Sequence, residues 1–500
     1  MSFFLGLDVG TSSAKAVIVD ESGTFHALER SEYDILCPHS GWAEQEPETW
    51  WSAICTAVQR TLSSFGRSPS EICGVAVSSQ MHTLVALDAS DHPVRPAILH
   101  NDARTAAQLQ TMRLQLGAGA EARLCNPICN GMTVPSLLWI RDTEPSHYDQ
   151  IAHVLLPADY IRLRLTGEHS SDHSNASSTL AYDVALGTWS DDTLRALDLP
   201  RSFFSPCYDS TDLAGRITPE AAAQCGLAAG TAVYFGGADQ VMQSIGCGSI
   251  RPGQATVNLG SGAQVCIQTD HLAPAPDAGL NAFLSYRKDK WYTMAANSNG
   301  GSAFKWICRN ILKEPDYDAV DRAIAAVRPG ADGLLFLPYL NGERCPHRNP
   351  DLSGCFLGLT YLTDPARMAR AVMEGVTFSL LDCLNACRNA GFSPDRLIVL
   401  GGGAVSPVWL QMQADIYNLP VMRTRSQEQA VLGAAICAAA GSGAFSSVEE
   451  ACGASVPSYD DPVLPNQESH KIYESYYFYY RQFFAATHES LEGITRLGRS

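Results

Sequence analysis

The stretch Phe235-Gly236-Gly237-Ala238-Asp239-Gln240 decides how this chain can fold and what chemistry it can carry. The residues before it, 231–234, alternate branched and small side chains, which is typical of a buried strand. The two glycines then predict a tight turn into a helix, with Asp239 at the start of that helix. A carboxylate at this place lies beside free backbone N–H groups, and we expect them to favour its ionised form.

An ionised Asp on a rigid turn has the chemistry of a general base for a hydroxyl group. The alternative is that Asp239 only caps its helix, because Asp is a preferred N-cap residue. Taken by itself, this stretch favours the cap. The rest of the chain shifts the balance towards the general base.

Length and composition describe an ordered globular protein with at least two domains. The 500 residues exceed what one hydrophobic core supports, and 46% are hydrophobic against 17% charged. The net charge of −17 argues against nucleic acid or an anionic membrane surface as the main partner. An anionic substrate is still compatible, since glycine-rich loops and arginines bind phosphate locally.

The 16 cysteines indicate neither a metal site nor a disulfide framework. No Cys-x-x-Cys pair occurs, and no His lies at ligand spacing beside the pairs Cys125/Cys129 and Cys383/Cys387. We therefore expect reduced, mostly buried thiols in a cytoplasmic protein. The first eight residues lack the basic segment of a signal peptide, and no apolar run reaches membrane-spanning length.

Each half of the chain is predicted to contain a β-hairpin with a small, hydroxyl-bearing tip. The strands are 3–9 with 14–19 and 255–259 with 263–267, and the tips are Gly10-Thr11-Ser12-Ser13 and Gly260-Ser261-Gly262. Such tips can enclose a phosphate, although an ordinary polar turn has the same composition. Asp8, just before the first tip, could hold Mg²⁺ through water. The repeat suggests duplicated α/β domains that face one another across a cleft.

Polar residues follow two further apolar stretches in the first half. A predicted strand over 72–77 leads to Gln80-Met81-His82, whose neutral donors and acceptors suit sugar hydroxyls, although a lone His there is more often structural. After the apolar residues 97–99 comes His100-Asn101-Asp102-Ala103-Arg104, which is either a capped helix start or a binding cluster. Residues 104–170, which lie between these two clusters and Asp239, mainly show the hydrophobic period of helices. Residues 170–179 have no period, and we expect a solvated linker or a loop lining a cleft.

The second half repeats the construction of strand, glycine turn and helix, but without an acid. A strand over 396–400 ends in Gly401-Gly402-Gly403-Ala404, before a helix from about Pro407. The three successive glycines leave room for a flat ring against the backbone. A later helix over 429–436 carries small residues on several faces and should pack closely. The aromatic helix expected over 470–491 should cap the core of its own domain, with an interaction surface as the alternative.

Taken in order, these segments resemble the FGGY carbohydrate kinases, in their xylulokinase-like branch, over essentially all 500 residues. The segments that carry the resemblance are Asp8-Val9-Gly10-Thr11-Ser12, residues 42–47 (Trp-Ala-Glu-Gln-Glu-Pro), Gln80-Met81-His82, Asn101-Asp102 with Arg104, Asp239, residues 336–344 (Phe-Leu-Pro-Tyr-Leu-Asn-Gly-Glu-Arg) and Gly401-Gly402-Gly403-Ala404. None of them is specific alone, but together they are.

The resemblance implies an α/β fold of two actin-like (ribonuclease-H-type) domains flanking a cleft for ATP and sugar. Residues 1–246 would bind sugar and phosphate and carry the catalytic Asp, and residues 247–500 would bind the nucleotide. The implied reaction is ATP-dependent phosphorylation of a ketose, D-xylulose to D-xylulose 5-phosphate, with Asp239 deprotonating the attacking hydroxyl. The implied partners are ATP, Mg²⁺ and the sugar, without nucleic acid or membrane, and a homodimer is compatible.

The resemblance also assigns residues to each part of the site. For the sugar these are Gln80, Met81, His82, Asn101, Asp102, Arg104 and Gln240. For ATP they are Asp8, Gly10, Thr11, Ser12, Lys15, Gly260, Ser261, Gly262, Gly402, Gly403 and Ala404. Asp8 and Asp239 would hold Mg²⁺ through water.

Several positions depart from the usual xylulokinase pattern, mostly near the sugar and the phosphates. They are Gln240 for Asn, His100 for Trp, Ser79 for Gly, and Gly260-Ser261-Gly262 for Gly-Thr-Ser. Gln264 and Asn299-Gly300-Gly301 are more similar to sedoheptulokinase-type relatives. Alternatives are therefore a kinase for another ketose or a polyol, with sedoheptulose first, or a catalytically silent sugar sensor.

Overall fold

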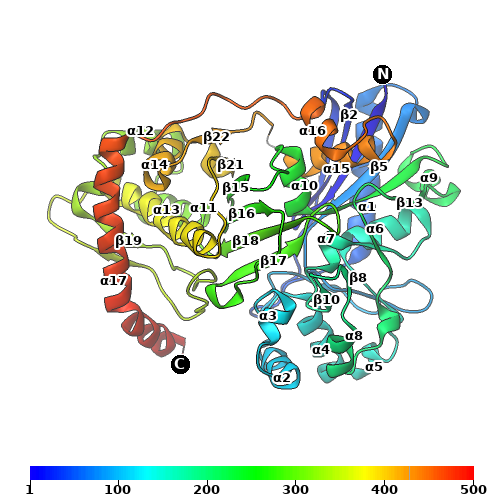
Figure 1. Ribbon diagram of the computed structural model, residues 1–500, viewed down its shortest axis with the longest axis horizontal. Coiled ribbons are helices and arrows are strands. Elements are labelled where there is room, and N and C mark those ends of the chain that lie inside the picture. Colours follow the sequence, from blue (N-terminus) through cyan, green and yellow to red (C-terminus); the bar gives the residue numbers. More distant parts are fainter. Residues whose placement is uncertain (427, 500) are drawn as a thin grey trace.

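Each half of the chain builds a mixed sheet, and the central strands of the two sheets share one topology (Figure 1). The computed structural model describes residues 1–426 and 428–499. In each sheet, three antiparallel strands are extended by two parallel strands on the side of the first. This arrangement confirms the predicted duplication and the α/β fold class.

The first sheet has the order β13-β14-β5-β1-β2-β3. Its strands are β1 (Phe3–Val9), β2 (Ser13–Asp20), β3 (Phe25–Glu32), β5 (Ile72–Ser79), β13 (Leu213–Arg216) and β14 (Ala232–Ala238). The second has the order β17-β18-β16-β15-β21-β22. Its strands are β15 (Ala255–Leu259), β16 (Ala263–Thr269), β17 (Leu280–Leu284), β18 (Trp291–Asn297), β21 (Leu397–Gly401) and β22 (Val421–Arg423). Both predicted hairpins are present, as β1-β2 and β15-β16.

The glycines before Asp239 do not form the predicted turn, because β14 continues through both of them. Gly236 instead makes a bulge, at which the register of β14 against β5 shifts. Its φ is +66°, and a Cβ there would lie 2.2 Å from the carbonyl oxygen of Val77. Glycine is therefore required at 236 for close strand contact rather than for a change of direction.

Helices cover the outer face of each sheet, and most of them begin with a proline, which suits the first helical turn. On the first sheet these are α1 (Pro47–Phe65), α6 (Pro157–Thr166) and α9 (Pro219–Cys225). On the second they are α13 (Pro365–Asn389), α14 (Pro407–Tyr417) and α17 (Gln467–Arg499). The predicted helix start near Pro407 is confirmed.

Two helices, α10 (Asp239–Gly246) and α15 (Gln429–Gly441), join the halves of the molecule. One core cluster combines their side chains with Phe4 of the first sheet and Met294 of the second. The helices approach so closely that a Cβ on Gly246 or Gly433 would lie 1.9 Å from a carbonyl oxygen of the other helix. The close packing predicted for residues 429–436 is thus confirmed.

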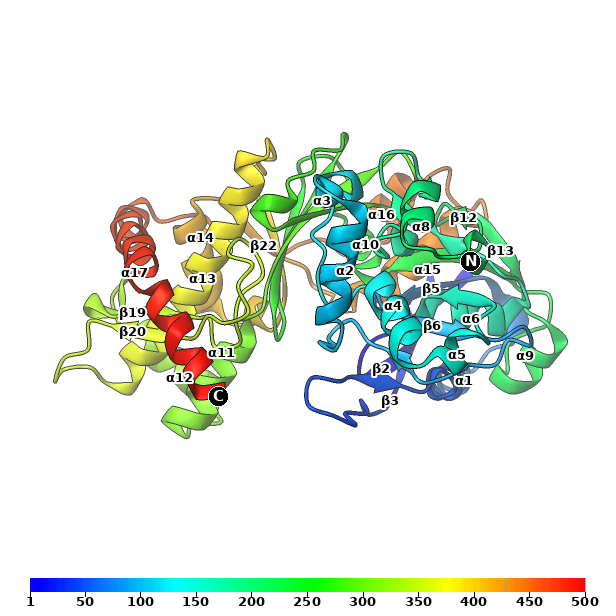
Figure 2. The same ribbon diagram turned by 90° about the horizontal axis from the view of Figure 1, so that it is seen from below.

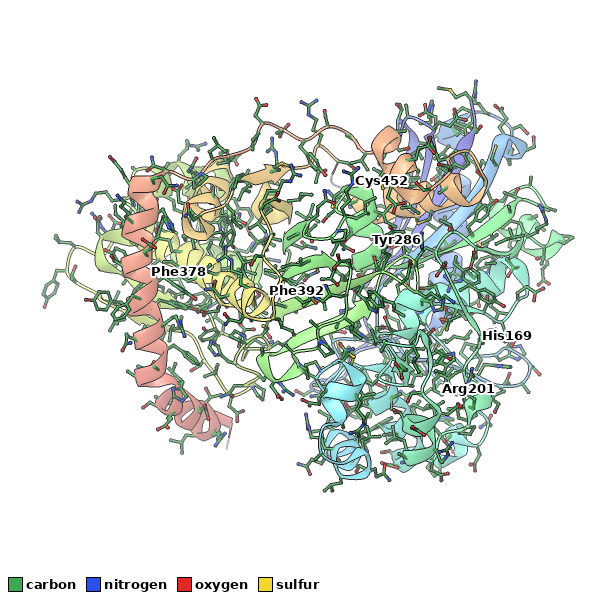
Figure 3. The ribbon with its side chains drawn as sticks, viewed as in Figure 1. His169, Arg201, Tyr286, Phe378, Phe392 and Cys452 are labelled. Atoms are coloured by element: carbon green, nitrogen blue, oxygen red, sulfur yellow. The ribbon has the colours of Figure 1, made fainter. Side chains whose placement is uncertain are left out.

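Although α15 follows the second sheet in sequence, it packs against β1, β5 and β14 of the first. Figure 1 shows α15 and the next helix, α16 (Val448–Ser455), in orange beside the blue strands of the N-terminal half. Tyr286, labelled with Cys452 in Figure 3, extends this contact by donating a hydrogen bond of 2.7 Å to Glu449 of α16. The division of the chain after residue 246 stays a prediction.

An insertion between β5 and β14 forms a further, mostly helical unit with its own core. Its elements include β6 (Val85–Leu87), α2 (Ala106–Leu116), α3 (Ala120–Leu124), α4 (Thr133–Thr143), α5 (Pro145–Tyr148), β8 (His153–Leu155), α7 (His173–Ala176) and α8 (Asp191–Ala196). The predicted helical character of 104–170 is confirmed. In Figure 2, α2 and α3 lie at the border between the lobes. There the two carboxylate oxygens of Glu121 accept hydrogen bonds of 2.9 Å from Arg348 of the second half.

Residues 170–179 are buried throughout, so a solvated linker is the wrong prediction for this segment. Its polar groups satisfy one another instead of water. Asp172 accepts hydrogen bonds from Ser174 (2.5 Å) and from Arg162 of α6 (3.1 Å). The alternative, a loop beside the cleft, fits its contacts described below.

The aromatic helix α17 covers the core of the second lobe, as predicted. Tyr473, Tyr480 and Phe483 are buried, and the ring of Phe378, labelled in Figure 3, packs 5.3 Å from Tyr480. On the opposite side, Phe478 and Tyr479 are exposed by 58% and 62%.

All 16 cysteines are free thiols, and most of them are buried, as expected. Exceptions are Cys37, Cys73 and Cys129, which are exposed. Within residues 1–426 and 428–499, no helix combines the length and the apolar character needed to cross a bilayer.

Candidate active site

Three parallel strands, β1, β5 and β14, end at one edge of the first sheet, and each is followed by a predicted site residue. The register pairs Asp8 with Ser78 and Ser78 with Gly237. Because carboxyl ends of parallel strands meet at the same edge, Asp8, Gln80 and Asp239 come together there. These residues are widely separated in sequence, and the sheet topology alone unites them.

Asp239 is the first residue of α10, and its strand is held firmly from behind. The N-cap position belongs to Ala238, which makes no side-chain cap, so helix capping does not account for Asp239. The Ala238 N–H donates to the Ser174 hydroxyl at 2.9 Å. Arg162 donates to the Phe235 carbonyl oxygen at 2.7 Å. The buried polar segment 170–179 therefore positions the backbone that presents Asp239.

The carboxyl of Asp239 is not simply ionised. Burial, and after it the negative charge of Asp8, raises its pKa to about 7, although the Gln240 N–H, at 2.7 Å, opposes both effects. The expectation that helix N–H groups keep this side chain ionised is thus wrong, because desolvation outweighs them. A base whose pKa lies near the working pH is well matched to proton transfer.

Asp8 lies beside the first hairpin tip and is itself buried. Its carboxylate accepts a hydrogen bond of 2.7 Å from Ser78, while burial raises its pKa and Ser78 and Lys15 oppose this. Asp8 and Asp239 therefore form an electrostatically coupled pair of carboxylates on one edge. Oxygen ligands of this kind are what a hydrated Mg²⁺ requires, so the residues fit the predicted metal.

The first tip, Gly10 to Ser13, is partly satisfied by its own contacts. The Gly10 N–H donates to the Ser13 carbonyl oxygen at 3.0 Å, so this N–H serves the turn. The Thr11 hydroxyl donates to Gln80 at 3.3 Å, which links the phosphate side to the sugar side. Lys15 on β2 forms an ion pair with Glu428, next to α15. Phosphate contact by Gly10, Thr11, Ser12 and Lys15 stays a prediction.

Gln80, Met81 and His82, the predicted sugar residues, follow directly after the end of β5. Gln80 and Met81 are buried, and the Gln80 Nε2 has no hydrogen-bond partner among the described residues. A buried amide donor without a partner is costly unless a ligand oxygen satisfies it. A sugar hydroxyl would do so.

His82 has the left-handed φ of 66°, and its Nδ1 lies 2.8 Å from the Ser178 carbonyl oxygen. That oxygen can only accept, so Nδ1 carries the proton and Nε2 is free to accept from a hydroxyl. Burial, together with the positive charge of Arg344, lowers the pKa of His82 to about 4, although the hydrogen bond to Ser178 opposes both effects. His82 is therefore neutral at physiological pH.

The other predicted sugar residues differ in how far contacts within the protein already occupy their side chains. Asn101 is exposed, whereas Arg104 donates to the Asp102 carboxylate at 2.9 and 2.7 Å and to Glu44 at 2.6 Å. The Arg104 guanidinium also lies 3.7 Å from the ring centre of Trp42. Asp102 and Arg104 thus stabilise a wall of the insertion, and their contact with sugar stays a prediction. Gln240 accepts a hydrogen bond from Cys266 Sγ at 3.6 Å.

A cavity of about 240 Å³ lies where β21 and β22 of the second sheet end. Gly402 and Ala404 line it, as expected for the nucleotide side. Gly403 lies beneath, where a Cβ would be 2.4 Å from the Leu259 side chain. Gly402 has only a contact at 3.8 Å, so it alone leaves an open face for a flat ring.

The second tip, Gly260 to Gly262, rests on Asn299-Gly300-Gly301. The Gly301 N–H donates to the Gly260 carbonyl oxygen at 2.7 Å. A Cβ on Gly300 would lie 2.4 Å from the Gly262 carbonyl oxygen. The departure at 299–301 is thus explained by close packing under the tip. Phosphate contact by Gly260, Ser261 and Gly262 stays a prediction.

Models of the FGGY family of carbohydrate kinases match both halves of the chain, the N-terminal domain over residues 3–246 and the C-terminal domain over residues 255–442. The chain belongs to this family. The phosphotransferase class predicted from the sequence, with ATP as donor and a sugar as acceptor, is thereby confirmed.

Relatives of this FGGY kinase include a xylulose kinase from Bacillus subtilis, 32% identical, with 97% of both chains covered. A gluconokinase from the same organism is 31% identical over 87% of this chain and 86% of its own. Among solved structures, a xyloylose kinase from Brucella ovis has a TM-score of 0.91 and 30% identity, covering 97% of this chain and 99% of its own. The predicted pair of FGGY domains is confirmed.

Sequence reasoning missed several polar residues around the cleft of this kinase. Gln243 of α10 and Asn258 of β15 share a hydrogen bond of 3.1 Å and line the nucleotide cavity. Glu343 is 3% exposed and accepts N–H bonds of 2.7 Å from Ser298 and Arg344, while burial raises its pKa to about 8. The spacing of Gln243 from Asp239, one helical turn, could have indicated it. For Glu343 the only sequence signal is its place in residues 336–344.

Proposed function

We propose that this FGGY kinase transfers the γ-phosphoryl group of ATP to the 5-hydroxyl of D-xylulose, with Asp239 as general base. The observation that carries the proposal is the shared strand edge. There β5, which leads to Gln80 on the sugar side, lies between β1 with Asp8 on the phosphate side and β14, which leads to Asp239. The charge of Asp8 nevertheless acts on Asp239 across this edge. The relatives named above as xylulose and xyloylose kinases support the choice of sugar.

In the proposed reaction, the 5-hydroxyl oxygen forms a bond to the γ-phosphorus as its proton passes to a carboxylate oxygen of Asp239. The bond from the γ-phosphorus to the bridging oxygen breaks, and ADP leaves. His82 Nε2 accepts a hydrogen bond from the sugar, and Gln80 Nε2 donates one. These contacts orient the hydroxyl, and orientation supplies much of the rate in phosphoryl transfer.

The metal assignment follows from the same carboxylates. Asp8 and Asp239 would hold Mg²⁺ through water, and the ion would supply positive charge against the phosphate oxygens. The ion would offset the cost of burying the Asp8 carboxylate, because it would supply a counter-charge beside the hydrogen bond from Ser78. The positive charge of the ion would also weaken the electrostatic repulsion between the Asp8 and Asp239 carboxylates.

The test of the substrate is a panel of sugars in an assay that couples ADP release to a signal. D-xylulose should give the highest kcat/KM against D-ribulose, sedoheptulose, glycerol and D-gluconate. Equal stimulation by another sugar would overturn the choice of D-xylulose and leave the kinase assignment in place. Absence of sugar-dependent ADP release with every member would instead favour the silent sensor.

D-gluconate is the second candidate, because a gluconokinase is among the relatives and a cation faces the sugar side. Arg344 lowers the pKa of both His82 and His100, so its positive charge acts on that side. A guanidinium could pair with the carboxylate of a sugar acid. If gluconate is the substrate, Arg344→Met should raise its KM strongly, whereas for D-xylulose the same variant should change KM only a few-fold.

The finer cellular assignment is also a proposal. We place the enzyme in the cytoplasm, because the free and mostly buried thiols suit a reducing compartment. Fractionation of cells followed by immunodetection would test it, and enrichment in a membrane or extracellular fraction would contradict it.

A further inference from the structure

Three side chains with metal-binding groups come together on the insertion, apart from the residues of the active site. They are Asp91, His153 and His169, which we call the outer cluster, and one ligand atom from each lies within 4.8 Å of the others. His169 is labelled in Figure 3, at the side of the molecule opposite α17.

The fold brings the outer cluster together from three separate segments. The pairing of β6 with β8 sets His153 opposite Leu87, directly beside the turn that contains Asp91. That turn is closed by a hydrogen bond of 2.9 Å from the Asp88 N–H to the His92 carbonyl oxygen. His169 follows Gly167, which ends α6 in a left-handed conformation and turns the chain back towards the same place.

The contacts within the cluster leave ligand capacity unused. His169 Nε2 lies 2.9 Å from the Asp91 carboxylate, and the rings of His169 and His153 are 4.0 Å apart. His169 Nδ1 is buried and has no hydrogen-bond partner in the part of the chain that the structure describes. An exposed ion pair of His169 with Asp91 would be worth at most about 1 kcal/mol and would give no reason for His153.

The donor set decides which cation suits this place. Two imidazoles and one carboxylate match Zn²⁺ and its neighbours Co²⁺, Ni²⁺ and Cu²⁺, whereas Mg²⁺ prefers oxygen ligands. The three ligand atoms lie within 4.8 Å of one another, so a bound ion would draw these side chains closer together. We propose that the outer cluster binds one divalent transition cation of the Zn²⁺ type, with an open position for water.

The bound ion would tie the 88–92 turn, the start of β8 and the end of α6 to one another. It would therefore stabilise the insertion without entering the kinase reaction. At a Zn²⁺ concentration about 100-fold above the dissociation constant, the melting temperature should rise by roughly 3 °C. The proposal does not depend on which sugar the enzyme phosphorylates.

The test uses the full chain, treated with a chelator and titrated without nucleotide or sugar. Co²⁺ should give the visible absorption bands of a tetrahedral N/O site, and one equivalent of Zn²⁺ should remove them, while excess Mg²⁺ should not. Asp91→Asn and His169→Asn should each weaken binding by at least about 100-fold, since even partners one shell further out cost 10–100-fold.

His92→Gln is the matched control, because His92 lies in the same turn and its side chain is 78% exposed. It should leave the affinity unchanged. Loss of binding in His92→Gln, or unchanged affinity in Asp91→Asn and His169→Asn, would overturn the proposal. The proposal would also be overturned if the outer cluster became saturated only at Zn²⁺ concentrations at which Mg²⁺ competes for it.

Two measurements guard against a variant that merely fails to fold. Kinase activity of Asp91→Asn should equal that of the wild type, because the exposed turn is remote from Asp239. Anomalous scattering at the zinc edge from a soaked wild-type crystal should place the ion among the three side chains. A peak elsewhere, with none at the cluster, would refute the assignment without any substitution.

Discussion

The two sheets share a topology but differ in what stands at the ends of their equivalent strands. At the first sheet, β1 and β14 lead to carboxylates, Asp8 and Asp239. At the second, β15 carries Asn258 where β1 carries Asp8, and β21, the equivalent of β5, leads to Gly402, which is open to a cavity. The equivalent of β14 is β22, which ends at Arg423 in the lining of the same cavity. The two sheets therefore provide the same backbone framework, and a few side chains at one edge of each sheet distinguish the function of its lobe.

The comparison supports the proposal that the first lobe carries the chemistry and that the second binds the nucleotide. Buried carboxylates are costly, and the fold retains two of them close enough to raise the pKa of Asp239. At the equivalent places the second lobe has an amide, Asn258, and a cation, Arg423, where the first has carboxylates, and it provides backbone access at Gly402. Substitutions at the two edges should accordingly change different kinetic constants.

The largest effect should come from removing the carboxylate of the first edge. Asp239→Asn keeps the shape but cannot take the proton, so kcat should fall by about 10³-fold or more. Binding of sugar and nucleotide, measured by calorimetry, should persist within a few-fold. Turnover equal to the wild type would remove Asp239 from the mechanism and cancel the contrast between the lobes.

The pH dependence should reveal the same carboxylate. A general base acts in its ionised form, and its pKa here is about 7, so kcat/KM should rise with pH and level off above that value. At pH 5 the rate should be about 100-fold below the plateau, because ionisation falls about tenfold per pH unit. The residual activity of Asp239→Asn provides the control and should lack this step. A profile that is flat from pH 5 to 8 would contradict the assignment.

A substitution at the second edge should act on the nucleotide alone. Gly402→Val places a branched side chain in the cavity, and the KM for ATP should rise by about 10-fold or more while the KM for sugar stays constant. The matched control is Gly453→Val, where a Cβ meets nothing within 4 Å. An equal rise of both KM values would mean that the two edges are not separate in function.

The smallest effect should come from the segment that holds Asp239 from behind. Ser174→Ala removes the acceptor of the Ala238 N–H and should lower kcat a few-fold to about 10-fold, with both KM values little changed. Ser249→Ala is the control, because its buried hydroxyl has no hydrogen-bond partner among the described residues. Identical kcat values for the two variants would show that Ser174 only fills space.

Local patterns in the sequence predicted much of this frame. The hairpins, the strand over 72–77 and the proline-started helices follow from period and turn chemistry, and the start of α10 at Asp239 follows from the end of the apolar run. The position of the glycine bend was wrong because a bulge and a turn have the same composition. Only the register against β5 distinguishes them.

Properties that depend on distant partners could not be predicted. The pKa of Asp239 follows from burial and from Asp8, which lies in another strand. Residues 170–179 looked solvated because polar side chains such as Asp172 find their partners only in the folded state. Of the assigned sugar residues, Asp102 and Arg104 occur next to one another in sequence, but nothing local shows that they pair.

The return of α15 to the first sheet limits how this protein can be divided. A fragment of residues 1–246 would lack the helix that covers β1 and β5, and it would expose side chains such as Phe4 to water. The complementary fragment would carry α15 without the sheet it fits. Each fragment would then expose a hydrophobic surface that is buried in the intact protein. Co-expression of the two fragments therefore offers a route to a split enzyme that regains activity only when the fragments reassemble.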